Sequence, residues 1–147
     1  MEKKIFFIDF DGTLMRDDKT ISDKNREALR NAVDQGDYIA LATGRAVSSG
    51  RRIAKELGLT RPGCYLVAYN GGTIYDFSAD CILSNKRLPI EYAEYLLREA
   101  TEAGIHIQTY SDTQVLAAER SKELDFYTKK TGMPCRITGN LNSMLYE

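Results

Sequence analysis

The stretch Ile5-Phe6-Phe7-Ile8 followed by Asp9-Phe10-Asp11-Gly12-Thr13 decides the fold. Its first four residues are all apolar, which is typical of a parallel strand covered on both faces. Gly12 then breaks the run, because glycine allows the chain to turn sharply. The stretch therefore predicts the first strand of a parallel sheet, with two carboxylates at the edge where ligands bind in open α/β folds.

Two more apolar runs end in polar residues in the same way. Residues 38–42 lead into Thr43-Gly44-Arg45, and residues 64–69 lead into Asn70-Gly71-Gly72. A helical pattern lies between each pair of neighbouring strands, and each of these patterns ends at a glycine. The β-α-β-α-β order with short connections favours the α/β class, with a doubly wound parallel sheet.

The pattern changes after Gly72. The remaining chain predicts a hairpin, a helix that starts at a proline, two antiparallel strands and a last helix, with no apolar strand after residue 118. We expect a core domain at residues 1–84 and a second, α-β-β-α domain at residues 85–147. The segments are 73–75 with 81–83, 89–104, 105–110 with 114–118, and 122–131.

The composition excludes several classes of protein. Lys and Arg number 20 and Asp and Glu 21, spread along the chain, so binding to nucleic acid or to a membrane surface has no electrostatic support. No apolar run is long enough to span a membrane. The three cysteines are far apart, which favours a reduced, cytoplasmic protein, and the single histidine, His106, cannot complete a zinc site.

The two acidic residues after the first strand suit phosphoryl transfer. Asp9, held at the sheet edge, would attack phosphorus in line, and Asp11 would lie on the same side and move a proton. A carboxylate that attacks an anion needs a bridging cation, and Mg²⁺ suits a site with one or two carboxylates. We expect Asp9 and Asp11 to be both the catalytic residues and the metal ligands.

Main-chain and hydroxyl groups near these acids would bind the phosphoryl oxygens. The candidates are the amides around Phe10 and Gly12, the Thr43 hydroxyl and the Gly44 amide. The residues argue against a calcium loop of the EF-hand type, because that loop would need glycine at Leu14 and glutamate at Thr20.

Two further residues have alternative interpretations. Arg45 is either a substrate contact or a solvated residue at a helix start. Asn70 is either a substrate contact or part of a hairpin turn, since Asn-Gly is a strong hairpin signal.

These motifs resemble a known family. Asp9-Phe10-Asp11-Gly12-Thr13-Leu14 looks like the first signature of the haloacid dehalogenase superfamily of phosphohydrolases, and Thr43-Gly44-Arg45 looks like its second. Asn70-Gly71-Gly72 fits the Asn-Gly turn of its Cof-like subfamily. The resemblance implies an aspartyl-phosphate on Asp9, Asp11 as acid and base, Mg²⁺ on Asp9 and the Asp11 carbonyl, and phosphate on Thr43.

The resemblance also implies segments of the family that are not found among residues 1–147. Complete members carry a later lysine that contacts phosphate and a Gly-Asp segment with more magnesium ligands. The resemblance thus indicates a truncated member, with part of the core and the first part of an inserted α+β cap. Strands missing beside the first strand would leave residues 5–8 as an exposed apolar edge. We expect a homo-oligomer or partner chain there.

The leading function is a phosphatase of small phosphorylated metabolites, with weak or no activity in these residues alone. Two alternatives remain open at this stage. One is a phosphotransferase similar to phosphomannomutase, which shares the aspartate loop. The other is a non-catalytic remnant that acts as a binding or oligomerisation module.

Overall fold

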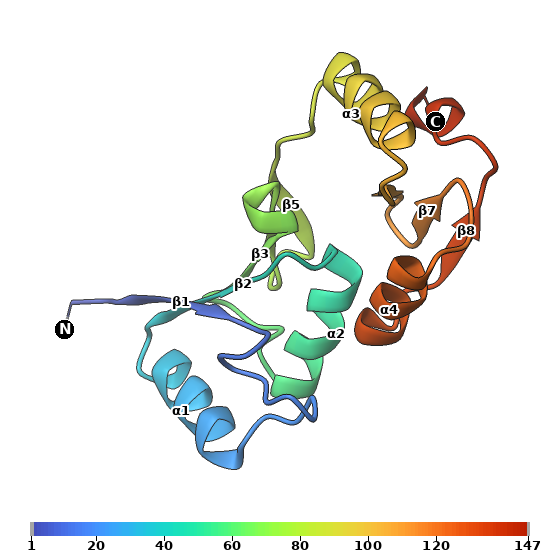
Figure 1. Cartoon of the computed structure of the whole chain (residues 1–147). Helices are drawn as coiled ribbons and strands as arrows, with labels where there is room; N and C mark the ends of the chain where they lie inside the picture. Colours follow the sequence, from blue (N-terminus) through green and yellow to red (C-terminus); the bar gives the residue numbers. More distant parts are fainter. Residues whose placement is uncertain (1, 147) are drawn as a thin grey trace. The chain divides into compact units, whose positions relative to one another are not determined.

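The computed structural model describes residues 2–146. The chain divides into two compact units, Met1–Lys86 and Arg87–Glu147 (Figure 1).

The first unit contains a five-stranded sheet in the order β1-β2-β3-β4-β5. β1, β2 and β3 are parallel, whereas β4 and β5 form an antiparallel extension. The α/β class, the three parallel strands and the hairpin expected after Gly72 are therefore confirmed. The strands are β1 (Ile5–Asp9), β2 (Tyr38–Ala42), β3 (Cys64–Ala68), β4 (Thr73–Asp76) and β5 (Cys81–Asn85).

Two helices connect the parallel strands, α1 (Asp23–Asp34) and α2 (Val47–Leu57). α1 begins where the Ser22 hydroxyl accepts a hydrogen bond from the amide of Asn25, which satisfies one of the free donors of the first turn. α2 ends at Gly58, whose φ of 72° is a left-handed conformation that glycine adopts without strain.

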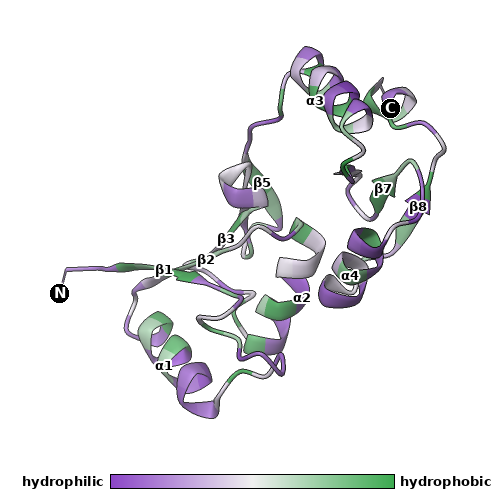
Figure 2. Ribbon diagram, viewed as in Figure 1, coloured by the Kyte–Doolittle hydropathy of each residue, from purple (hydrophilic) through white to green (hydrophobic). Residues whose placement is uncertain are grey.

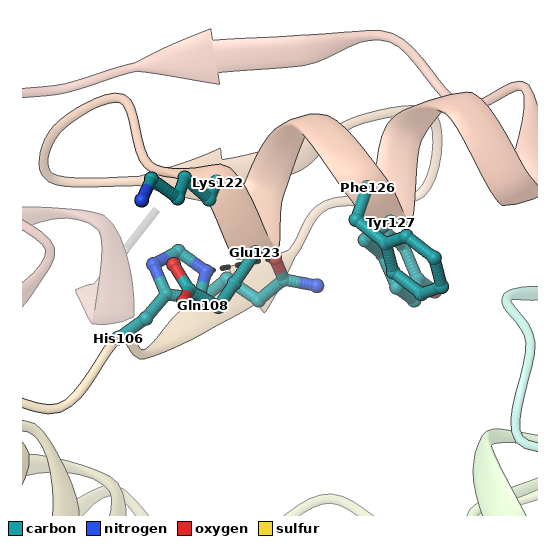
Figure 3. Close-up of a pocket in the computed structure, with 6 residues that line it drawn as sticks. All are labelled: His106, Gln108, Lys122, Glu123, Phe126 and Tyr127. Carbon is teal, nitrogen blue, oxygen red and sulfur yellow. Dashed lines mark hydrogen bonds between the residues drawn. The ribbon is translucent and has the colours of Figure 1, made fainter.

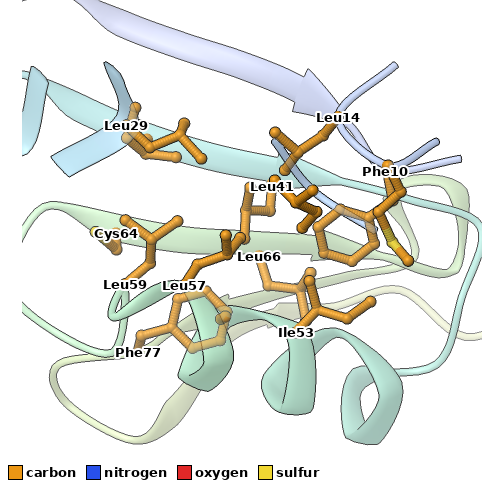
Figure 4. Close-up of a cluster of buried hydrophobic side chains, with 14 of the residues drawn as sticks. Phe10, Leu14, Leu29, Leu41, Ile53, Leu57, Leu59, Cys64, Leu66 and Phe77 are labelled. Carbon is orange, nitrogen blue, oxygen red and sulfur yellow. The ribbon is translucent and has the colours of Figure 1, made fainter. Parts of the chain in front are cut away.

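Both helices pack against the same face of the sheet. Leu41 and Leu66 are opposite each other in β2 and β3, and both belong to the buried cluster that includes residues of α1 and α2 (Figure 4). α2 approaches closely, because a Cβ added to Gly50 would lie 2.6 Å from a methyl carbon of Leu66. This face forms the hydrophobic core of the first unit.

β1 forms one edge of this sheet and is poorly covered. Ile5 and Phe7, on the face opposite the helices, are 51% and 66% exposed, and Phe6 is 40% exposed. Much of β1 is hydrophobic in Figure 2. The prediction that this strand is covered on both faces is therefore wrong for residues 2–86, and the exposed edge inferred from the resemblance is present.

The other edge strand, β5, pairs with its neighbour less regularly than β1 does. Its pairing with β4 shifts register between Ile74 and Tyr75, which marks a β-bulge or irregularity in the ladder. Bulges of this kind twist an edge strand and interrupt its ladder.

The second unit contains a small sheet in the order β6-β7-β8 with helices α3 and α4. The predicted α-β-β-α order is confirmed, but a third strand, β8, follows it and runs parallel to β7. The sequence analysis expected no apolar strand after residue 118 and did not predict β8, a three-residue strand that is exposed throughout. The elements are α3 (Ile90–Glu102), β6 (Gln108–Tyr110), β7 (Val115–Ala117), α4 (Lys122–Thr131), β8 (Cys135–Ile137) and a 3₁₀ turn, η2 (Asn142–Tyr146).

A separate core holds the second unit together. One cluster consists of Leu97, Leu116 and Leu141, with Met144 and Leu145 packed against it, and other side chains of the unit are also buried, among them Val115 and Leu124. None of the helices within residues 2–146 is long and apolar enough to cross a membrane.

Candidate active site

Asp9 is the last residue of β1 and lies opposite Ala42, the last residue of β2. Its carbonyl accepts a hydrogen bond from the amide of Leu14 at 3.1 Å, so the chain folds back directly after the strand. Asp9 itself is exposed. Its carboxylate therefore stands at the carboxyl edge of the sheet, on a fixed main chain and accessible to a ligand.

The residues after Asp9 form a tight loop anchored in the core. Phe10 is fully buried, and its carbonyl accepts from the amide of Met15 at 2.8 Å. Gly12 has a φ of 80°, which explains why glycine follows the second aspartate. The Gly12 amide donates to the Met15 carbonyl at 3.2 Å, so this amide stabilises the loop itself.

Asp11 is held by two cations. Arg45 donates from Nε to Oδ2 at 2.9 Å and from Nη2 to Oδ1 at 2.7 Å, a two-pronged pair that fixes the plane of the carboxylate. Lys19 donates to Oδ1 at 3.1 Å. Because Arg45 is only 5% exposed, its interpretation as a solvated helix start is wrong.

Hydrogen bonds join the second and third strand ends. The Thr43 hydroxyl accepts from the amide of Arg45 at 3.1 Å, and the Thr43 carbonyl accepts from the amide of Asn70 at 3.1 Å. The amide of Tyr69 donates to the Arg45 carbonyl at 3.0 Å. A Cβ on Gly44 would lie 2.8 Å from the Asn70 side-chain oxygen, so the Asn70 side chain could keep its present position only with glycine at residue 44.

The expected turn at Asn70 is present. Asn70 has a φ of 53° and ψ of 36°, a left-handed conformation that asparagine tolerates better than most residues. It lies in the short turn η1 (Tyr69–Gly71), between the antiparallel strands β3 and β4. The turn explains Asn70 structurally, and its side chain also lies against Gly44.

Two residues of this network were not expected from the sequence. Lys19 reaches Asp11 from a turn in which it adopts a φ of 65°. Ser49 is buried and accepts a hydrogen bond from Nη1 of Arg45 at 3.4 Å. The spacing of Arg45 and Ser49 by four residues, at the start of α2, is the only sequence signal for this contact.

The donor set for a metal is small. No group of three or more His, Cys, Asp or Glu side chains within residues 2–146 is arranged to hold a metal ion. The ligands that the family resemblance implies, the carboxylate of Asp9 and the main-chain carbonyl of Asp11, belong to the end of β1 and to the loop that follows it. Mg²⁺ is commonly bound by one or two carboxylates together with substrate phosphate and water, so these groups fit part of such a site.

The second unit has a pocket of its own on β6 and α4 (Figure 3). His106 contacts Gln108 through Nε2 at 3.1 Å and Ser121 through Nδ1 at 2.9 Å. Since both ring nitrogens are engaged, His106 is held in place as part of the pocket wall. The lining residues are His106, Gln108, Lys122, Glu123, Phe126 and Tyr127.

Comparison with known proteins identifies the family. Residues 6–140 match the family model of haloacid dehalogenase-like hydrolases. The chain is 33% identical over 146 residues to the Bacillus subtilis 5-amino-6-(5-phospho-D-ribitylamino)uracil phosphatase YwtE, which covers 94% of this chain and 47% of that enzyme. It is 32% identical over 127 residues to the HMP-PP phosphatase of Yersinia enterocolitica, across 80% of this chain and 45% of that protein.

A solved structure shows the same arrangement. The crystal structure of a haloacid dehalogenase-like hydrolase from Bacteroides thetaiotaomicron superposes with a TM-score of 0.86 and 28% identity, across 97% of this chain and 54% of that chain. The chain thus spans about half the length of these relatives. On the family match, the two aspartates after β1 and the shared fold, the chain belongs to the haloacid dehalogenase-like hydrolases, in the Cof-like subfamily.

Proposed function

We propose that this chain carries the phosphoryl-accepting part of a magnesium-dependent phosphatase for small phosphorylated metabolites. One observation carries the proposal: the exposed carboxylate of Asp9 ends β1, and two residues later Asp11 is fixed by Arg45. The names of the relatives, which include a 5-amino-6-(5-phospho-D-ribitylamino)uracil phosphatase and an HMP-PP phosphatase, support a small phosphorylated substrate.

In the proposed reaction, a carboxylate oxygen of Asp9 attacks phosphorus, and the new bond joins this oxygen to phosphorus. The bond from phosphorus to the ester oxygen breaks, and that oxygen receives a proton from Asp11. Water then attacks the phosphoryl group, returns a proton to Asp11 and releases inorganic phosphate, which restores the Asp9 carboxylate. The contact from Lys19 to Asp11 is single and exposed, so we expect it to open when Asp11 exchanges its proton.

The neighbouring groups have distinct proposed roles. Mg²⁺, held by Asp9 and the Asp11 carbonyl, would offset the repulsion between carboxylate and phosphate. The main-chain amides around Phe10, the amide of Gly44 and the Thr43 hydroxyl would bind phosphoryl oxygens. Arg45 acts through Asp11 as a positioning residue, since its guanidinium is buried against that side chain.

The test measures phosphate release from a panel of phosphorylated metabolites, with and without Mg²⁺. We expect weak activity that needs Mg²⁺ and is abolished by Asp9→Asn. The matched control is Asp34→Asn, an acidic residue at the end of α1 that lies outside the site. Equal activity in wild type and Asp9→Asn would contradict the proposal. Transfer of the phosphoryl group within the substrate, without release, would support the phosphomannomutase-like alternative.

A binding module is the second candidate function, and one observation favours it: both Asp11 oxygens already accept hydrogen bonds from cations. Trapping of beryllofluoride with Mg²⁺ separates the two candidates. Binding that depends on Asp9 supports the phosphatase, whereas no binding at millimolar Mg²⁺ supports the module.

We also propose a cytoplasmic protein that forms a homo-oligomer through the exposed edge of β1. All three cysteines are free, with Cys64 buried and Cys81 and Cys135 exposed, which suits a reducing compartment. The apolar edge supports the oligomer.

A further inference from the structure

The turn that joins β3 to β4 has an unusual main chain. Tyr69, Asn70 and Gly71 have φ values of 50°, 53° and 97°, so three consecutive residues lie in the left-handed region. Glycine adopts this conformation freely, whereas other residues are disfavoured in it by about five- to thirtyfold each, asparagine less than a bulky residue such as tyrosine. Two residues other than glycine thus hold a strained main chain directly after β3.

Hydrogen bonds show what the strained turn holds. The amide of Tyr69 donates to the carbonyl of Arg45 at 3.0 Å, and the amide of Asn70 donates to the carbonyl of Thr43 at 3.1 Å. In an extended strand, the amides of neighbouring residues point to opposite sides. Both amides therefore reach the same loop only because the chain leaves the extended conformation at Tyr69.

The turn itself is anchored within the first unit. The side chain of Tyr69 packs against the buried cluster, and its carbonyl accepts a hydrogen bond from the amide of Gly72 at 3.1 Å. The carbonyl of Gly72 accepts from the amide of Lys86, directly after β5, at 2.7 Å. Strained main chain persists where the surrounding structure fixes it in this way. The turn is therefore a fixed support for the loop that it contacts.

The supported loop, Thr43-Gly44-Arg45, has its outer residues bonded and its central amide available. The amide of Thr43 donates to the carbonyl of Val67 at 2.9 Å, and the amide of Arg45 donates to the Thr43 hydroxyl at 3.1 Å. Among residues 2–146, no group accepts a hydrogen bond from the amide of Gly44. The hydrogen bonds thus fix both sides of Gly44 and leave its amide as a donor for a ligand.

The Asn70 side chain covers Gly44. A Cβ built on Gly44 would lie 2.8 Å from Oδ1 and 3.4 Å from Nδ2 of Asn70. Asn70 therefore fills the side of Gly44 on which any other residue carries its side chain. Glycine has more main-chain freedom than other residues, and this contact limits the room in which the Gly44 peptide can rotate.

We propose that the strained turn of Tyr69 and Asn70 is a clamp on the Thr43–Arg45 loop, and that the Asn70 side chain is a positioning residue for the Gly44 amide. A donor that is already oriented needs no reordering when an anionic group binds. The clamp rests on contacts within the first unit. Only the use of the Gly44 amide for a phosphoryl oxygen rests on the proposed function.

The order parameter of the Gly44 amide, from ¹⁵N relaxation, tests the positioning role without a ligand. We expect about 0.85 in wild type, as in rigid main chain, and less than about 0.6 in Asn70→Gly, which keeps the turn but removes the side chain. Asn70→Asp keeps the size of the side chain and tolerates the left-handed conformation, so it should retain the wild-type value. An equal order parameter in wild type and Asn70→Gly overturns the proposal.

Urea denaturation separates positioning from a purely structural role. Because glycine adopts the conformation of residue 70 freely, Asn70→Gly should change the equilibrium constant for unfolding by less than about threefold. Asn70→Ala must adopt a left-handed conformation that suits alanine poorly, so its unfolding constant should rise about fivefold or more. If Asn70→Gly destabilises the chain as much as Asn70→Ala does, the side chain acts on stability and the positioning role is wrong.

Lys19→Gly is the matched control. Lys19 is also left-handed, with a φ of 65°, but its side chain reaches Asp11 and not Gly44. We expect this variant to leave the Gly44 order parameter unchanged. A fall equal to that in Asn70→Gly would show a general effect of glycine substitution and overturn the proposal.

Hydrogen exchange tests the main-chain part of the clamp. The amides of Tyr69 and Asn70 should exchange at least roughly a hundredfold more slowly than in an unstructured peptide, because both donate to the loop. Exchange at the unprotected rate in wild type would overturn the clamp.

Binding of beryllofluoride with Mg²⁺, followed by ¹⁹F NMR, tests the link to the proposed function. We expect Asn70→Gly to bind about tenfold more weakly than wild type, since its Gly44 amide must be ordered on binding. Equal binding by the two proteins would overturn the role of Asn70 toward the ligand. If wild type does not bind while the Gly44 order parameter responds as expected, the proposed function fails and the clamp stands.

Discussion

Arg45 and Asp11 lie 34 residues apart in sequence and are joined by two hydrogen bonds, from Nε at 2.9 Å and from Nη2 at 2.7 Å. The guanidinium also donates to Ser49 in the first turns of α2. The pair therefore couples the loop after β1 to the start of α2. It fixes the side chain of the proposed proton donor, Asp11, relative to the main chain at the start of α2.

Arg45→Met tests how much this pair stabilises the fold. Removing one partner of a buried ion pair commonly costs about 3–5 kcal/mol, because the other charge is left without compensation. The Asp11 side chain is 28% exposed and keeps Lys19, so we expect a loss of about 2 kcal/mol in the free energy of unfolding. Urea denaturation followed by circular dichroism measures it.

The control for that measurement is Arg120→Met. Arg120 and its partner Asp125 are 76% and 50% exposed, and exposed pairs contribute about 0–1 kcal/mol. If Arg45→Met and Arg120→Met lower the free energy of unfolding by the same amount, the buried pair of Arg45 and Asp11 stabilises the fold no more than an exposed pair does.

Gly50→Ala should destabilise the first unit although alanine favours helices. The new methyl group would lie 2.6 and 2.7 Å from the two Cδ atoms of Leu66, so either the fully buried Leu66 side chain or α2 must shift. Overpacking of this kind costs about 1–3 kcal/mol, more than the ~1 kcal/mol that alanine gains over glycine in a helix. Ser48→Ala, exposed on the same helix, is the control and should be neutral or stabilising. A rise in melting temperature for Gly50→Ala would contradict this close packing.

Thr43→Val removes the acceptor for the buried amide of Arg45. An unsatisfied buried donor costs about 1–3 kcal/mol, so we expect a loss within that range, whereas Thr43→Ser keeps the hydroxyl and most of the stability. Thermal denaturation of both variants measures the difference. Equal melting temperatures would show that the hydroxyl has no structural role.

Ionisation of Tyr75 should make the stability of the fold depend on pH at high pH. Burial, together with the hydrogen bond that its hydroxyl donates to Asp80, raises the pKa of Tyr75 to about 12 from its ordinary value of 10. Since the folded-state pKa is raised, the contribution to stability is fully present below about pH 10 and is lost as the pH rises through about 12. We therefore expect wild type to lose more stability than Tyr75→Phe over that interval.

Urea denaturation at several pH values between about 9 and 12 measures this difference. The Tyr75→Phe variant corrects for the other tyrosines, which titrate in both proteins. Parallel curves for the two proteins would exclude an effect of Tyr75.

Most of the first unit was predictable because its signals are local. Continuous apolar runs marked β2 and β3, and Gly58 marked the end of α2 through a conformation that other residues avoid. The short strand β8 was missed because its three residues are exposed and only their pairing with β7 marks them as a strand. No periodicity in so short a segment distinguishes a strand from a loop.

The candidate site was predictable only in part, because only some of its features follow from local sequence. The position of Asp9 follows from where β1 ends, which the sequence shows directly. The burial of Arg45 depends on a partner 34 residues away, and Lys19 reaches Asp11 only from a turn with a positive φ. Such contacts depend on tertiary structure. The sequence therefore marks Arg45 as a motif residue but does not identify Asp11 as its partner.

The irregular ladder between β4 and β5 has a consequence for how the sheet can grow. One edge of the sheet is interrupted by a shift in register between Ile74 and Tyr75, whereas the ladder between β1 and β2 is regular. A bulge bends and twists the strand that carries it, so a further strand pairs less readily with β5 than with β1. The local geometry of one hairpin thus directs any extension of this sheet to the opposite side.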